Sequence, residues 1–223
     1  MFDLFIFAVF PYVAIIVAVG GAIWRFFTNQ YTYSSLSSQL LEKRILFWGS
    51  IPWHYGITIL LIGHLIGIIL PFAVTAFNSI PARLYILEGI ALSLGVLALV
   101  GLVVLIIRRS GNKRIHKVTS LMDAVLLLLL LFQVSAGITL AIIYRWGSDW
   151  FVHLTPVYFL SLGKFNPVIE QVASLPLLVK SHILNGFLLI ALIPFTRLVH
   201  IFIFPIGYLW RPFQKVIWHS RKF

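Results

Sequence analysis

The chain has 223 residues, of which 61% are hydrophobic and only 10% charged, and its formal net charge is +11. A soluble domain is about a quarter charged, so this composition excludes a soluble globular protein and indicates an integral membrane protein. The absence of cysteine excludes disulfides, Cys-ligated iron–sulfur clusters and a CxxCH haem site within this chain. In a membrane protein, the excess of Lys and Arg indicates basic cytoplasmic loops facing anionic lipid or an acidic partner subunit, rather than nucleic acid.

Five apolar runs are each long enough to span a bilayer, which takes about 20 helical residues. The first run lacks a basic leading region and is longer than the apolar core of a signal peptide, so we interpret it as a retained span. We therefore predict an all-α integral membrane protein, with one membrane domain over residues 1–223 that forms a bundle of five transmembrane helices. The predicted spans are about 3–27, 48–72, 84–107, 121–144 and 175–207, with an outer loop at 145–174 and a cytoplasmic tail at 208–223.

The distribution of Lys and Arg between the connections predicts the orientation, because basic residues concentrate on the cytoplasmic side of a membrane protein. They are more numerous after the first and third spans and in the tail than in the other connections. The N-terminus is therefore expected outside and the C-terminus in the cytoplasm.

The outer connection at 145–174 is unusually long for a link between two helices of a bundle, and it is rich in aromatic residues. We expect it to lie along the membrane surface. It would serve either as a lid over the bundle or as a simple tether in the interface.

Two apolar stretches carry histidines, and these stretches organise the functional prediction. The segment 53–67, WHYGITILLIGHLIG, contains His54 and His64, and the segment 181–205 contains His182 and His200. Ionisable groups inside membrane spans are costly and usually serve a function. Four imidazoles, two on each of two spans, indicate two metals that each have two axial ligands.

The direction of the two spans predicts how these histidines pair. The second span runs inward to outward and the fifth runs back, so the first histidine of one meets the last of the other: His54 with His200, and His64 with His182. In continuous helices His54 and His64 lie about 15 Å apart along the helix axis, whereas His182 and His200 lie about 27 Å apart. Tilted haems, or a kink at Pro194, would have to absorb the difference of about 12 Å.

Residues beside the histidines are compatible with a haem pocket. Gly63 and Gly67 flank His64 and Gly56 follows His54, and each could leave room for a flat macrocycle. The alternative for Gly63 and Gly67 is a close contact between helices. Arg197 could pair with a haem propionate or extend to the membrane interface. The remaining histidines are interpreted as solvated or interfacial: His116, His153 and His219.

With these histidines and spans the chain resembles the gamma subunit of membrane-bound respiratory nitrate reductase, a di-haem cytochrome b. The resemblance covers nearly the whole length and includes the five spans and the outward N-terminus. It rests on the number, order and spacing of the histidines together with four motifs: SSQLLEKR at 37–44, WHYGITILLIGHLIG at 53–67, PFTRLVH at 194–200 and YLWRPFQKVIW at 208–218.

This resemblance implies two haem b cofactors in a multi-pass protein of the prokaryotic cytoplasmic membrane. His64 and His182 would be the axial ligands of a distal haem near the outer face, and His54 and His200 those of a proximal haem near the cytoplasm. Menaquinol or ubiquinol would be oxidised near the distal haem, with its protons released outward. The electrons would pass to an iron–sulfur beta subunit and then to a molybdenum-containing alpha subunit that reduces nitrate on the cytoplasmic side.

The family also has a lysine in the quinol pocket, just before the third span. The corresponding residue here is Arg83, which can donate a hydrogen bond to a quinone oxygen but does not readily lose its proton. An ordinary interfacial arginine is the alternative. Glu88 is a second candidate for this pocket, as a proton acceptor. Asp123 and Gln133 in the fourth span are expected to form hydrogen bonds between helices.

Two other functions remain open from the sequence. A related cytochrome b could serve another molybdenum or iron–sulfur oxidoreductase, because the substrate chemistry resides in the partner. A haem-free transporter could use the histidines to bind ions, although the few carboxylates within the spans argue against it. A purely structural anchor would not need four buried imidazoles.

Overall fold

The structure is a computed structural model that describes residues 2–28, 41–144 and 147–201. Within these ranges all the regular elements are helical. In chain order they are α1 (Phe2–Leu4), the π-helical turn η1 (Phe5–Val9), α2 (Phe10–Thr28), α3 (Arg44–Ile69), α4 (Pro71–Asn78), α5 (Pro81–Gly111), α6 (Lys113–His116), α7 (Leu121–Ile143), α8 (Gly147–Gly163), α9 (Glu170–Ala173), α10 (Leu177–Leu192) and the 3-10 turns η3 (Ile193–Phe195) and η4 (Arg197–Ile201).

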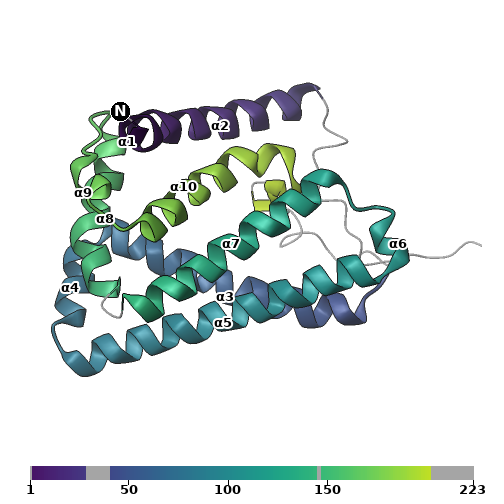
Figure 1. Ribbon diagram of the computed structural model, residues 1–223, viewed down its shortest axis with the longest axis horizontal. Helices are drawn as coiled ribbons and strands as arrows, with labels where there is room; N and C mark the ends of the chain where they lie inside the picture. Colours follow the sequence, from purple (N-terminus) through teal and green to yellow (C-terminus); the bar gives the residue numbers. More distant parts are fainter. Residues whose placement is uncertain (1, 29–40, 145–146, 202–223) are drawn as a thin grey trace, which may run out of the picture.

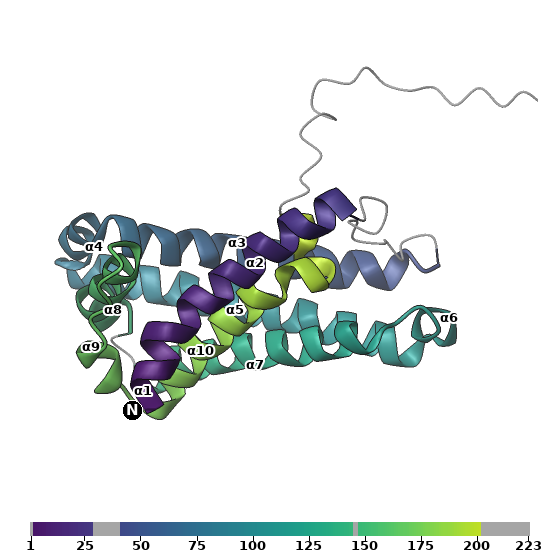
Figure 2. The same cartoon turned by 90° about the horizontal axis from the view of Figure 1, so that it is seen from above.

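Five of the helical segments are long and apolar enough to cross a membrane, so the predicted all-helical, five-span architecture is confirmed. They cover Phe5–Thr28, Arg44–Ile69, Pro81–Gly111, Leu121–Ile143 and Leu177–Phe195. Figure 1 shows them side by side in one bundle, with α4, α8 and α9 at one end and α6 at the other. Figure 2 shows that α2 and α10 run together, obliquely to α3, α5 and α7. The direction in which the bundle crosses the membrane stays a prediction.

Local sequence signals explain where the helices begin. Pro71 and Pro81 occupy the first turns of α4 and α5, where a missing backbone N–H costs nothing and the fixed φ suits a helix. Ser120 begins α7 with a capping box, in which its hydroxyl accepts from the Asp123 N–H and its own N–H donates to the Asp123 carboxylate.

Helices α3 and α5 pack at very short range through glycines. A Cβ added to Gly101 would lie 2.5 Å from the backbone nitrogen of Trp53, and one added to Gly56 would lie 2.6 Å from the Leu94 carbonyl oxygen. Small residues at such crossings let two membrane helices approach closely and pack by van der Waals contact. Gly56 therefore faces α5, so the expectation that it leaves room for a macrocycle beside His54 is wrong.

The connection at 145–174 is mostly helical and is packed onto the bundle. Helix α8 lies across the end of the bundle beside α4 (Figure 1). Tyr158 is fully buried, and its hydroxyl donates to the Phe7 carbonyl at 2.8 Å inside the π-helical turn. Tyr12 donates in return to the Leu162 carbonyl at 2.9 Å. The packing of this connection, which we call the end-cap, agrees with a lid over the bundle and not with a simple tether.

The fifth span is shorter than the predicted 175–207. Helix α10 ends at Leu192, the buried Pro194 lies in the turn η3, and Thr196 is extended with φ −125° and ψ −178°. The chain then makes the separate 3-10 turn η4, because proline interrupts the helical hydrogen-bond ladder. Residues 202–207, and the predicted tail at 208–223, lie outside the described residues.

Replacement of Gly101 by valine is expected to destabilise the bundle by about 1–3 kcal/mol, because the new side chain would overlap the backbone of α3. Thermal unfolding of the purified protein in detergent measures the effect. The matched control is Gly20→Val on α2, where an added Cβ meets no atom within 4 Å. An equal loss of stability in the two variants would contradict the close α3–α5 contact.

Candidate functional site

The two histidines expected to hold the proximal haem lie close together, edge to face. His54 on α3 and His200 on η4 have ring centroids 6.0 Å apart, with an interplanar angle of 68°. Two metal–nitrogen bonds of about 2 Å, with about 1 Å from each nitrogen to its ring centre, would place two axial imidazoles about 6 Å apart. The spacing of this pair therefore fits a single metal held between the two rings.

The tautomer of three histidines is set by backbone acceptors. The Nδ1 atoms of His54 and His64 lie 2.7 Å from the carbonyl oxygens of Ser50 and Leu60, one helical turn earlier. The Nδ1 atom of His200 lies 2.6 Å from the carbonyl oxygen of Arg197. Since a carbonyl only accepts, each Nδ1 carries a proton, and in the neutral imidazole each Nε2 then keeps its lone pair. Metal-bound histidines are oriented in this way by their second nitrogen.

His182 has a different environment. Its Nε2 lies 3.2 Å from the Gln133 amide nitrogen on α7, and its Nδ1 is buried without a hydrogen bond. Asn185 donates to Gln133 Oε1 at 2.6 Å and to the Leu129 carbonyl at 3.0 Å. Gly137 gives the ring its space, because a Cβ there would lie 3.2 Å from the imidazole. To bind a metal through Nε2, His182 would have to give up its contact with the Gln133 amide.

His64 is exposed and has an aromatic neighbour from the end-cap. The ring of Phe151 on α8 lies 5.4 Å from it, edge to face. The same phenyl ring covers Gly67, where an added Cβ would lie 2.8 Å from it, whereas an added Cβ at Gly63 meets nothing within 4 Å. Gly63 thus borders open space and Gly67 supports the packing of α8.

Arg197 forms an ion pair instead of extending freely to the interface. Its guanidinium donates to both carboxylate oxygens of Asp123, at 2.7 Å and 3.2 Å. Arg109 on α5 lies 2.8 Å from the same carboxylate. The predictions that Asp123 and Gln133 form bonds between helices are confirmed by these contacts and by the bond from Asn185 to Gln133.

A second ion pair joins the start of α3 to the end of α5. The buried Arg108 donates to the carboxylate of Glu42 at 2.7 Å and to its carbonyl at 2.7 Å. Desolvation opposes ionisation of Glu42. Two backbone N–H groups from the first turn of α3, together with the arginine, outweigh it and hold the pKa of Glu42 below its usual value. The carboxylate is therefore ionised and pairs with the buried guanidinium.

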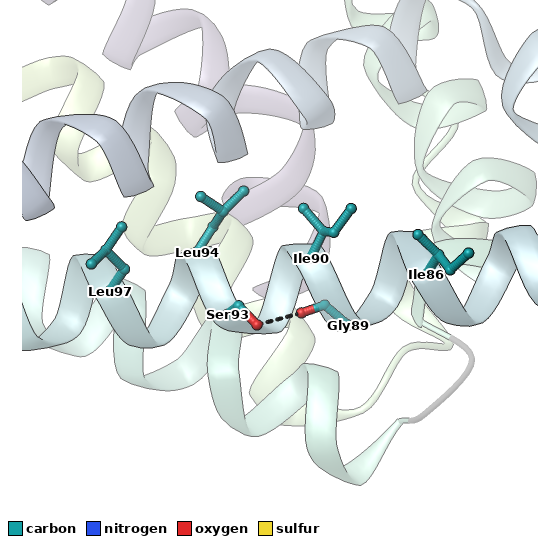
Figure 3. A pocket seen from close by; sticks show the side chains of 6 residues that line it. All are labelled: Ile86, Gly89, Ile90, Ser93, Leu94 and Leu97. Atoms are coloured by element: carbon teal, nitrogen blue, oxygen red, sulfur yellow. Dashed lines mark hydrogen bonds between the residues drawn. The ribbon is translucent and has the colours of Figure 1, made fainter.

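The two candidate quinol-pocket residues lie in the first turns of α5. Arg83 is exposed, and its guanidinium carbon lies 5.7 Å from the centre of the Phe77 ring. Glu88 is partly buried. An open groove of about 560 Å³ follows along the same helix (Figure 3). It is lined by apolar groups and one hydroxyl: Ile86, Gly89, Ile90, Ser93, Leu94 and Leu97.

Sequence reasoning missed Asn185, Arg109 and Phe151 as neighbours of the predicted ligands. Asn185 had a recognisable signal, because it lies three residues after His182 and so shares its helix face. The other two are brought to the site by tertiary packing. In the described part of the chain no three His, Asp or Glu side chains gather around one point.

Five long apolar helices define a multi-pass membrane protein, in which one pair of histidines, His54 and His200, lies close together. Residues 3–219 match the sequence profile of the family described as the nitrate reductase gamma subunit. The chain belongs to this family, whose members are membrane subunits of nitrate reductase.

Individual relatives agree with this assignment. The nitrate reductase gamma chain of Bacillus subtilis is 37% identical over 218 residues, which cover 96% of each chain. The respiratory nitrate reductase 1 gamma chain of Escherichia coli is 29% identical over 217 residues, again 96% of each. The nitrate reductase-like protein NarX of Mycobacterium tuberculosis is 33% identical over 219 residues. The aligned region covers 96% of this chain but only 33% of the longer NarX protein.

Replacement of Gln133 by leucine is expected to cost about 1–3 kcal/mol of stability, because it leaves the buried Asn185 without its side-chain acceptor. The double variant Gln133→Leu/Asn185→Leu should be less destabilised than Gln133→Leu alone, since both partners are then apolar. Thermal unfolding in detergent measures both. A double variant that is less stable than the single one would contradict the cluster as described.

Proposed function

We propose that the chain is the di-haem cytochrome b subunit of a respiratory nitrate reductase. It would oxidise quinol on the outer side and deliver the electrons to a cytoplasmic iron–sulfur beta subunit, which serves a molybdenum-containing alpha subunit. The membership of the family supports this function. The observation that carries it is the pairing of His54 and His200, with ring centres 6.0 Å apart.

The donor set of the proximal site fits a bis-histidine haem. His54 and His200 each present an Nε2 lone pair, and each holds its Nδ1 proton on a backbone carbonyl. When bound, haem b supplies a one-electron iron centre at such a site. The carbonyl acceptors raise the basicity of both imidazoles and fix the planes of their rings.

The distal site is assigned to His64 and His182. His64 has the same backbone-anchored tautomer and lies beside the open space at Gly63. His182 is held by Gln133, and its Nε2 would be released from that amide when it binds iron. The two sites lie at different depths, because ten residues of α3 separate their ligands by about 15 Å.

The quinol pocket is assigned to the first turns of α5. Arg83 would donate a hydrogen bond to a quinone oxygen and would remain charged throughout, since a guanidinium does not lose its proton in proteins. Glu88 would accept a proton as quinol is oxidised. The open apolar groove that follows on α5 would suit the isoprenoid chain of menaquinol or ubiquinol.

Single substitutions of the four histidines test the ligand pairing. His54→Ala and His200→Ala should each remove the same low-spin haem signal, and His64→Ala and His182→Ala should each remove the other. The reason is that loss of either axial ligand disrupts the centre it shares. Electron paramagnetic resonance and a pyridine haemochrome count on the purified complex measure this. Two haems per chain in all four variants would exclude the assignment.

Arg83→Gln is expected to lower quinol-driven nitrate reduction about 10- to 100-fold, which corresponds to the loss of one hydrogen bond to a charged donor. Arg83→Lys should retain most of the activity because it keeps a charged donor. Nitrate reduction driven by a dye that feeds electrons to the partner subunits is the control, and it should not change. Unaltered quinol oxidation in Arg83→Gln would remove this residue from the pocket.

A further inference from the structure

The turn η4, which carries His200, has little support of its own. Helix α10 ends at Leu192, and the extended Thr196 separates η4 from it. A five-residue 3-10 turn has poor hydrogen-bond geometry and is not stable in isolation. The position of His200 therefore depends on the contacts that η4 makes with the rest of the bundle.

The strongest of these contacts is the ion pair between Arg197 and Asp123. Arg197 Nε lies 2.7 Å from Asp123 Oδ1, and its Nη2 lies 3.2 Å from Oδ2. Two parallel bonds between a guanidinium and a carboxylate fix orientation as well as distance. The Asp123 side chain is only 6% exposed, so water competes weakly for this pair.

Asp123 is itself held rigidly. The Ser120 N–H donates to its Oδ2 at 3.0 Å, and its own N–H donates to Ser120 Oγ at 3.1 Å. Arg109 Nη1 lies 2.8 Å from the same Oδ2 as an ion pair. One carboxylate therefore connects α5, the start of α7 and η4.

A hydrogen bond continues this connection to the imidazole. The carbonyl of Arg197, whose side chain Asp123 holds, accepts the Nδ1–H of His200 at 2.6 Å. We propose that Asp123 is a positioning residue for His200. Through Arg197 it would fix η4 and orient the ring toward His54. The proposal rests on the proposed function, in which these two histidines hold one haem.

The change from carboxylate to amide is informative because it keeps the size of the side chain. In Asp123→Asn the guanidiniums of Arg197 and Arg109 lose the negative charge between them and repel each other. Arg197 then no longer holds η4 in one orientation. The loss of a negative charge near the iron also favours its reduced state, so the midpoint potential of the proximal haem should rise.

Asp123→Asn is tested in the complete nitrate reductase complex, by electron paramagnetic resonance and by a redox titration of each haem. The signal that His200→Ala removes identifies the proximal haem. We expect this signal to shift and its potential to rise, with the other haem unchanged. Asp123→Glu, which keeps the charge, should restore the signal at least in part. Wild-type signals and potentials for both haems in Asp123→Asn would overturn the proposal.

Glu42→Gln is the matched control, because it removes a carboxylate from Arg108, the neighbour of Arg109 on α5, without touching η4. It should leave both haem signals unchanged. An equal shift in Glu42→Gln would show a general loss of order at this end of the bundle and would overturn the positioning role.

Arg197→Lys provides a second test if the Asp123→Asn complex does not assemble. It keeps the charge and the carbonyl of residue 197 but loses the two-pronged contact. The electron paramagnetic resonance signal of the proximal haem should therefore shift by less than in Asp123→Asn, while its midpoint potential changes little because no charge is lost. No shift would overturn the proposal. Fewer than two haems in the wild-type complex would instead refute the proposed function, whereas two haems that Asp123→Asn leaves unaltered refute only the positioning role.

Discussion

The Nδ1 atoms of three of the four candidate ligand histidines are held by backbone carbonyls, and these hydrogen bonds determine which nitrogen is left to bind a metal. His54 and His64 place Nδ1 on the carbonyl of the preceding helical turn, and His200 does the same across its 3-10 turn. Each ring is thereby turned so that Nε2 points away from its own backbone. The ligand geometry therefore depends on local helical structure as much as on contacts across the bundle.

The long helices provide a rigid support for this arrangement. α3 carries two of the histidines and is packed against α5 through Gly49, Gly56 and Gly101. Backbone contacts at this range leave little freedom for α3 to rotate or slide. Since one face of α3 is committed to α5, its histidines are directed to the remaining faces, where η4 and the end-cap helix α8 bring His200 and Phe151.

The general architecture and the proximal pair could be predicted from the sequence, because both follow from strong signals. Apolar length predicts the spans, and the alternating direction of the spans predicts that His54 meets His200. The way in which the unequal spacing is absorbed could not be predicted. It depends on where the helix stops after Leu192 and on the turn that follows Thr196. A proline in a sequence predicts an interruption but not the path beyond it.

Polar contacts between distant elements were also only partly predictable. Asp123 and Gln133 were recognisable as polar residues in an apolar span, but their partners follow from packing. The role of Gly56 shows the same limit, since a glycine near a ligand serves equally well for a cofactor or a neighbouring helix. The actual contact, at 2.6 Å from the Leu94 carbonyl, decides for the helix.

The contacts of the first span have a consequence for biogenesis. α2 and its leading turns are held mainly by elements from the far end of the chain. Tyr158 donates to the Phe7 carbonyl, Tyr12 donates to the Leu162 carbonyl, and Lys180 pairs with Asp3 at 3.2 Å. This span therefore gains these contacts only after α8 and α10 have been synthesised.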